Sequence, residues 1–149
     1  MSVLDEVKEI KQVIEKCDSG FLEEAKVLLH AIPNKETLND LAVIYSSLPT
    51  LQLLQEEGLL LSSSDLLGQA CWTPNNIDIL EFLLLTGSPL DGNCYKYAAE
   101  SGTLDNLLWL QSKNCPLPEV LDLTVVKELG YSEVIDHCKL IEGIRIEGL

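Results

Sequence analysis

The chemically richest short segment is Asp136-His137-Cys138, near the C-terminus. A thiol beside an imidazole could form a Cys–His nucleophile pair, in which the histidine removes the thiol proton. Successive side chains on a helix point about 100° apart, however, so these three would not converge on one reacting atom. We expect a partly buried thiol beside a surface histidine, and no catalytic residue here.

The five cysteines are candidates for metal binding or disulfide formation. A zinc site needs Cys and His ligands at short spacing, whereas the gaps between Cys17, Cys71, Cys94, Cys115 and Cys138 are 54, 23, 21 and 23 residues. Their odd number and the absence of CxxC pairs argue against a disulfide framework. We expect buried free thiols and no metal or cofactor, and we interpret the last three gaps as recurring interior positions of a repeat.

Two other features could suggest a site. Ser62–Asp65 reads "SSSD", which we interpret as a loop and a helix cap and not as a nucleophile. Trp72 and Trp109 could form an aromatic cage, but Trp109 aligns with Phe82 in an apolar stripe, and Trp72 falls at a join between helices. No GxSxG, HExxH, P-loop or EF-hand motif occurs. The sequence therefore predicts a protein that is not an enzyme.

Charge is distributed unevenly along the 149 residues, whose formal net charge is −14. No Lys or Arg occurs from Glu36 to Tyr95, a stretch with eight acidic residues. An acidic surface repels phosphate backbones, so we expect no direct nucleic-acid binding. It attracts basic partners, although the same charge could serve only to keep the protein soluble.

No uncharged apolar run is long enough to cross a bilayer, so no membrane span is expected. The segment from Met1 to Cys17 carries acidic side chains where a signal peptide would be basic and then apolar. We expect an intracellular, cytoplasmic protein. Its length and its hydrophobic content of 46% predict one folded domain over residues 1–149.

These residues are set in an internal repeat. The segment 98–117 resembles 70–90, with Leu110 opposite Leu83 and Leu117 opposite Leu90. Fainter copies extend the pattern, and the period of about 27 to 29 residues is typical of solenoid proteins. We divide the chain into five units, at approximately 1–33, 34–62, 63–91, 92–119 and 120–149.

Each unit reads as two helices. Leu104, Leu107, Leu108 and Leu110 form an apolar stripe along one helix. Ser101-Gly102 before it is suited to end a preceding helix. The prediction is an all-α fold, an α-solenoid with helical caps. A plain helical bundle is the main alternative, because Leu-rich helices can match by chance. A tetratricopeptide array is a second alternative, but its 34-residue period does not fit.

The best-preserved unit resembles an ankyrin repeat of the short, divergent type common in giant DNA viruses and protists. The resemblance is carried by Ala98, Ala99, Gly102, Leu104, Leu107, Trp109, Leu110, Cys115 and Pro116. It implies an ankyrin-like solenoid that binds protein partners through its concave face; a viral origin would place it in host cytoplasm or nucleus. The TPLH tetrapeptide of standard ankyrin repeats is missing, and the loops are short, so the hairpin fingers are expected to be reduced.

The leading functional hypothesis is a non-catalytic protein-interaction module that binds a host or regulatory protein, with a basic surface, through its concave face and acidic centre. The alternative is an acidic decoy that imitates nucleic-acid charge and blocks a nuclease or another DNA- or RNA-binding protein. We regard Tyr95 and Lys96 as plausible anchors. The expected partner-binding residues are Ser64, Asp65, Gln69, Asp91, Asn93, Tyr95, Lys96, Glu100, Lys113 and Asn114.

Overall fold

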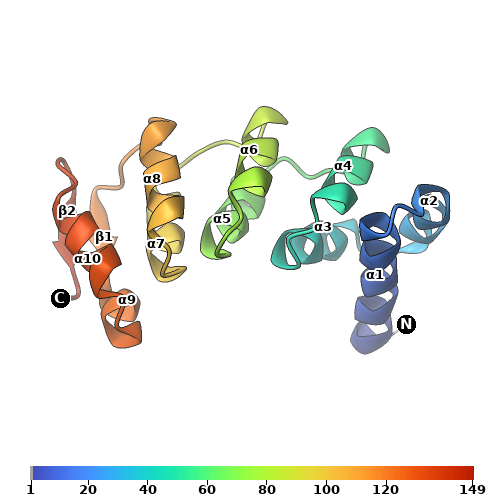
Figure 1. The fold of residues 1–149 in the computed structure, drawn as a ribbon, viewed down its shortest axis with the longest axis horizontal. Helices are drawn as coiled ribbons and strands as arrows, with labels where there is room; N and C mark the ends of the chain where they lie inside the picture. Colours follow the sequence, from blue (N-terminus) through green and yellow to red (C-terminus); the bar gives the residue numbers. More distant parts are fainter. Residues whose placement is uncertain (1) are drawn as a thin grey trace. The chain divides into compact units, whose positions relative to one another are not determined.

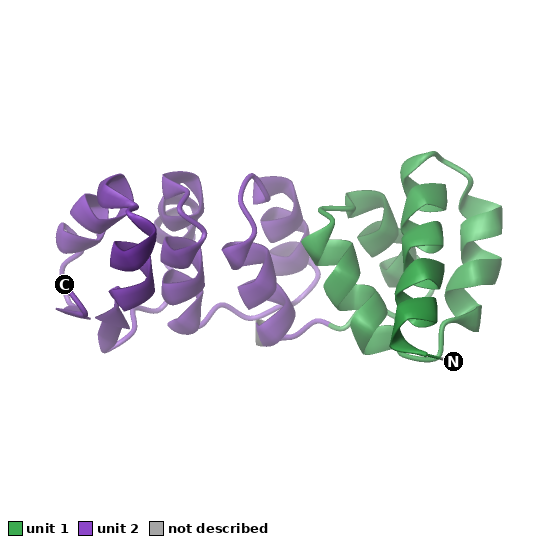
Figure 2. Cartoon of the chain, turned by 90° about the horizontal axis from the view of Figure 1, so that it is seen from below, with its two compact units in different colours: residues 1–61 green, residues 62–149 purple. Residues whose placement is uncertain are grey.

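The computed structural model describes residues 2–149, except for the side chain of Ser64. Over these residues it contains ten helices and one pair of three-residue strands (Figure 1). The prediction of an all-α fold is therefore confirmed apart from the strand pair. The chain divides into two compact units, Met1–Leu61 and Ser62–Leu149 (Figure 2), where we expect a single domain from the sequence. The division nearly coincides with the predicted end of the second repeat.

The first unit contains four helices. They are α1 (Val3–Asp18), α2 (Leu22–Ala31), α3 (Lys35–Ile44) and α4 (Leu48–Glu56). Consecutive helices pack as the pairs α1/α2 and α3/α4, and α1 also packs against α3 and α4. The side chains of Ser2, Asn34 and Ser47 cap α1, α3 and α4 by accepting a backbone N–H three residues later. These short polar residues satisfy donors that a helix start leaves open.

The core of the first unit is aliphatic. On α1 the buried residues are Ile10, Val13, Ile14 and Cys17, whose spacing places them on one helix face. Leu51, Leu53 and Leu54 of α4 are buried as well. The opposite face of α1 carries Lys8, Lys11 and Glu15, which are exposed.

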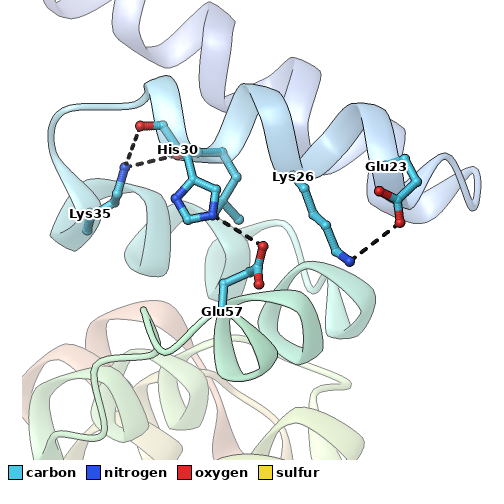
Figure 3. A network of polar contacts seen from close by, with 6 residues as sticks. Glu23, Lys26, His30, Lys35 and Glu57 are labelled. Carbon is cyan, nitrogen blue, oxygen red and sulfur yellow. Dashed lines mark hydrogen bonds and ion pairs between the residues drawn. The ribbon is translucent and has the colours of Figure 1, made fainter.

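A lysine closes the C-terminal end of α2 (Figure 3). The Lys35 ammonium donates to the backbone oxygens of Leu29 at 2.9 Å and His30 at 3.4 Å, and to that of Ile32. A cation is favourable at this end because the last carbonyls of a helix are unpaired and carry partial negative charge. His30 Nε2 also lies 3.2 Å from Glu57 Oε1, which joins α2 to the end of α4.

The second unit contains six helices and the strand pair. They are α5 (Ser64–Trp72), α6 (Ile77–Leu85), α7 (Asn93–Glu100), α8 (Leu104–Ser112), β1 (Val120–Asp122), α9 (Thr124–Leu129), α10 (Ser132–Lys139) and β2 (Arg145–Glu147). Consecutive helices again pack as pairs. In addition, α5 packs against α7 and α7 against α9, while α6 packs against α8 and α8 against α10. The first helices of the pairs thus form one row, and the second helices another.

The C-terminal end differs from the helical cap that the sequence predicts. β2 pairs in parallel with β1, with Val120 opposite Arg145 and Leu121 opposite Ile146. Leu121 is buried and Ile146 is half-buried, while Arg145 and Glu147 point to solvent. This alternation has the two-residue period of a strand. The segment 145–147 therefore closes the unit as a strand and not as a helix.

The turns inside the helix pairs recur. After the first helix of each pair, one residue has a positive φ angle, and these residues follow each other every 26 to 29 positions. The left-handed region is easiest for Gly and acceptable for Asn. The five residues are Gly20, Ser46, Asn75, Gly102 and Gly130.

The ends of the second helices recur as well. Residues Gly58, Gly87 and Asn114 adopt positive φ after α4, α6 and α8. The next N–H in each case donates back to a leucine carbonyl: Leu59 to Leu54 at 2.8 Å, Ser88 to Leu83 at 2.9 Å, and Cys115 to Leu110 at 3.1 Å. The side chains of Leu54, Leu83 and Leu110 are all fully buried. Three residues at the repeat spacing thus share one local geometry and one degree of burial.

Candidate functional site

The exposed side of α5 carries an acid near its start and an aromatic residue at its end. Asp65, Gln69 and Trp72 share this side, because residues three, four and seven positions apart lie along one helix face. Asp65 is exposed, and Trp72 has 57% of its surface exposed. Gln69 is half-buried, and its Oε1 has no hydrogen-bond partner among the described residues. The side chain of Ser64 lies outside the described part of the structure.

A second exposed aromatic residue reaches this side of α5 from α7. The Tyr97 ring lies so close to Gly68 that a Cβ at that glycine would be 3.0 Å from two ring carbons. A side chain at this position would therefore require the Tyr97 ring to shift slightly. Gly68 is one turn from Trp72 on α5, and Tyr97 is 38% exposed. The two aromatic side chains thus lie on the same surface.

Polar residues of α7 extend this surface. Asn93 and Lys96 are exposed and Glu100 is half-buried, and they share a side of the helix with Tyr97. Hydrogen bonds from the Thr124 hydroxyl and backbone lower the pKa of the Asp122 carboxyl, and the nearby Lys96 charge lowers it further. We call the set Asp65, Gln69, Trp72, Asn93, Lys96, Tyr97 and Glu100 the α5–α7 face.

Tyr95 does not belong to this face. We expect it from the sequence to be an exposed anchor, but only 2% of its surface is exposed, and its hydroxyl donates to the Cys115 carbonyl at 3.4 Å. The reason is the spacing of the buried residues Cys94, Tyr95, Ala98 and Ala99, which form the apolar stripe of α7. This prediction is wrong, and Tyr97, two residues later, takes the exposed position.

Asp91 is half-buried and has a local structural role. Its Oδ1 accepts the N–H of Asn93 at 2.9 Å just before α7. Its backbone oxygen accepts a hydrogen bond from the Cys115 thiol at 3.3 Å. Asp91 therefore orders the entry to α7, and a substitution there would disturb the fold as well as any binding surface.

Lys113 and Asn114 are exposed but are engaged elsewhere. Lys113 forms an ion pair with Glu81 of α6 at 2.9 Å, and the Trp109 indole donates to the same carboxylate at 2.7 Å. These contacts, the lysine first, lower the pKa of Glu81. Asn114 occupies the left-handed turn after α8. Both residues follow the second row of helices, so the structure does not join them to the α5–α7 face.

The catalytic alternatives do not assemble. Cys138 is buried, and burial raises the pKa of its thiol to about 11. His137 Nε2 instead lies 2.6 Å from Gln111 Oε1 of α8, and Asp136 is exposed. In the SSSD segment, Ser63 caps α5 by accepting the Leu66 N–H. As predicted, Trp109 is buried.

All five cysteines are free and buried, as predicted. Their interpretation as equivalent repeat positions is wrong for three of them. Cys71 lies near the end of α5, Cys94 near the start of α7, and Cys115 after α8. Their thiols interact with one another, a tertiary contact that residue spacing does not indicate.

Residues 2–149 contain neither a metal-binding cluster nor a helix suited to span a membrane. No group of three or more His, Cys, Asp or Glu residues in this range is arranged to hold a metal ion. None of the helices in the same range has the length and apolar character to cross a membrane.

Comparison with protein-family models, with curated proteins and with solved structures gives no match to this chain.

Proposed function

We propose that this chain is an ankyrin-like α-solenoid that acts as a non-catalytic protein-binding module. The α5–α7 face receives the partner. The observation that carries the proposal is the pair of exposed aromatic residues, Trp72 and Tyr97, on helices whose other apolar side chains are buried. Exposed Trp and Tyr side chains concentrate binding energy in protein interfaces.

The charges of the face favour a basic partner segment. Asp65 and Glu100 are carboxylates on the same face as the two aromatic residues, and Lys96 is already close to the carboxylate of Asp122. A lysine or arginine of the partner could stack on the exposed Trp72 ring. The same cation could pair with Asp65 or Glu100, and opposite charges speed association. The expected partner is a protein segment that presents Lys or Arg next to apolar residues.

The other features of the chain agree with a binding role. Asp136, His137 and Cys138 differ in exposure, and His137 is engaged by Gln111. An interaction module requires none of these groups to react. Within residues 2–149 the loops between helices are short and form no long hairpin fingers, so recognition would depend on the helices themselves.

The test uses a peptide array in which Lys and Arg are placed beside Leu, Phe or Trp, followed by calorimetric titration of the best peptide. Trp72→Ala should weaken its binding by roughly thirty-fold or more, the loss expected for a central aromatic anchor. Asp65→Lys with Glu100→Lys should weaken it as well, and more strongly at low salt than at high salt.

Leu85→Ala is the matched control, because Leu85 is 87% exposed but lies on α6. It should change affinity by less than about two-fold, as expected for a surface position outside the interface. Equal binding by the wild type and the Trp72→Ala protein would contradict the proposal. Binding that depends on total charge alone, and that DNA abolishes by competition, would instead favour the decoy alternative.

A further inference from the structure

Three cysteines meet inside the second unit and form what we call the thiol cluster: Cys71, Cys94 and Cys115. They come from α5, from α7 and from the segment after α8. The Cys94 thiol interacts with the thiols of both Cys71 and Cys115, and all three side chains are buried. Cys94 is therefore the centre of the cluster.

Two neighbouring groups hold the cluster in place. The backbone oxygen of Asp91 accepts a hydrogen bond from the Cys115 thiol at 3.3 Å. The Asp91 Oδ1 atom lies 3.9 Å from the Cys94 sulfur. The buried Tyr95 hydroxyl donates to the Cys115 carbonyl. The sulfurs of Cys94 and Cys115 are thus kept together by contacts to both backbone and side chains.

These interactions distinguish the acidities of the three thiols. Interaction with the Cys115 and Cys71 thiols lowers the pKa of Cys94. The same contacts, together with burial, raise the pKa of Cys71 and of Cys115. The proton therefore leaves Cys94 first, and the thiolate is the form of cysteine that reacts as a nucleophile.

We propose that a hydroperoxide oxidises the thiol cluster to an intramolecular disulfide that joins Cys94 to Cys71 or to Cys115. The Cys94 thiolate attacks one peroxide oxygen, the O–O bond breaks, and Cys94 becomes a sulfenic acid. Cys71 or Cys115 then attacks the Cys94 sulfur and displaces hydroxide. In total, two thiols and one H₂O₂ give one disulfide and two water molecules, because two electrons pass from sulfur to oxygen. This inference does not depend on the proposed binding function.

Contact between thiols, and not exposure, determines the selectivity of this reaction. Cys17 and Cys138 are buried to a similar degree. Burial raises the pKa of both thiols, and the Cys17 thiol interacts with the Thr50 side chain and not with another cysteine. They are natural controls within the same chain. Oxidant would reach the cluster by local opening. Asn114 and Pro116, on either side of Cys115 in the sequence, are both exposed.

The experiment treats the folded protein with H₂O₂, alkylates the remaining thiols after denaturation, and identifies products by mass spectrometry. The oxidised wild type should contain one Cys94–Cys71 or Cys94–Cys115 disulfide, which removes two hydrogen atoms. The other three cysteines, Cys17 and Cys138 among them, should be alkylated. Cys71→Ser should form only the link to Cys115, and Cys115→Ser only the link to Cys71. Cys94→Ser should form neither.

Circular dichroism establishes that each variant is folded before oxidation. If Cys94→Ser fails to fold, the two variants that retain Cys94 still test the proposal. Three results would overturn it: no disulfide in the folded wild type, a disulfide that uses Cys17 or Cys138 instead, or an undiminished intramolecular disulfide in folded Cys94→Ser.

Discussion

At the scale of single residues, one buried amide joins two helix pairs of the second unit. Asn106 of α8 is fully buried, and its Nδ2 donates to the carbonyls of Cys71 at 2.8 Å and Thr73 at 3.1 Å. These carbonyls lie at the end of α5, where the helix itself provides no donor. Asn106 therefore satisfies backbone groups that burial would otherwise leave unpaired.

We predict that Asn106→Ala lowers the free energy of unfolding by about 1–3 kcal/mol, because it leaves buried acceptors without a donor. Urea unfolding followed by circular dichroism measures the change. Asp105→Asn is the control: Asp105 is the exposed neighbour, and its substitution should change stability by less than about 0.5 kcal/mol. Equal stability of the two variants would show that the amide contacts contribute nothing.

The sequence predicts the burial of some side chains but not the contacts between separate helices. Spacing identifies Leu107 and Leu110 of α8 as buried, but Leu108, which we expect in the same stripe, is 44% exposed. The spacing of Tyr95 with Ala98 and Ala99 contains the signal that Tyr95 is buried. The close approach of Tyr97 to Gly68 and the meeting of three thiols are contacts between separate helices. Such contacts depend on how helices pack, which the pattern within one helix does not determine.

At the scale of elements, two glycines occupy equivalent turns but differ in their surroundings. They therefore distinguish the cost of backbone strain from the cost of a packing clash. Gly102 ends α7 with φ +75°, and Gly130 ends α9 with φ +77°. A Cβ at Gly102 would lie 2.6 Å from the Tyr131 ring, whereas a Cβ at Gly130 would meet no atom within 4 Å. The first glycine is required by its conformation and by its neighbour, the second by its conformation alone.

We predict that Gly130→Ala destabilises the protein by about 1–2 kcal/mol, the cost of a left-handed non-glycine residue. Gly102→Ala should cost more, by roughly another 1–3 kcal/mol, because the tightly packed Tyr131 ring must move. Thermal unfolding of both variants gives the comparison. A Gly102 variant as stable as the Gly130 variant would mean that Tyr131 does not pack against this turn.

Elements are predicted more completely than side-chain positions. The helix pairs follow from apolar spacing and from Gly and Asn at the turns. The strand pair does not, because β1 and β2 are three residues each and pair across the intervening helices α9 and α10. A segment this short has too few residues to show a two-residue period clearly.

At the scale of the whole molecule, one helix–turn–helix design is used in both compact units. Each unit contains turns in which an N–H outside the helix donates to a carbonyl five residues earlier. This 6→1 bond, together with the left-handed residue before it, is the Schellman ending of a helix. The donors are Phe21, Ser47 and Leu59 in the first unit and Ser88, Cys115 and Tyr131 in the second.

Amide hydrogen exchange measured by NMR tests this repeated design most directly. The six donor amides just named lie outside helices, where loop amides ordinarily exchange quickly. If the design recurs as described, all six should exchange on the order of a hundred-fold more slowly than an unstructured chain, a protection of roughly 2.7 kcal/mol. Unprotected exchange at these positions, beside protected amides in the flanking helices, would contradict the repeat.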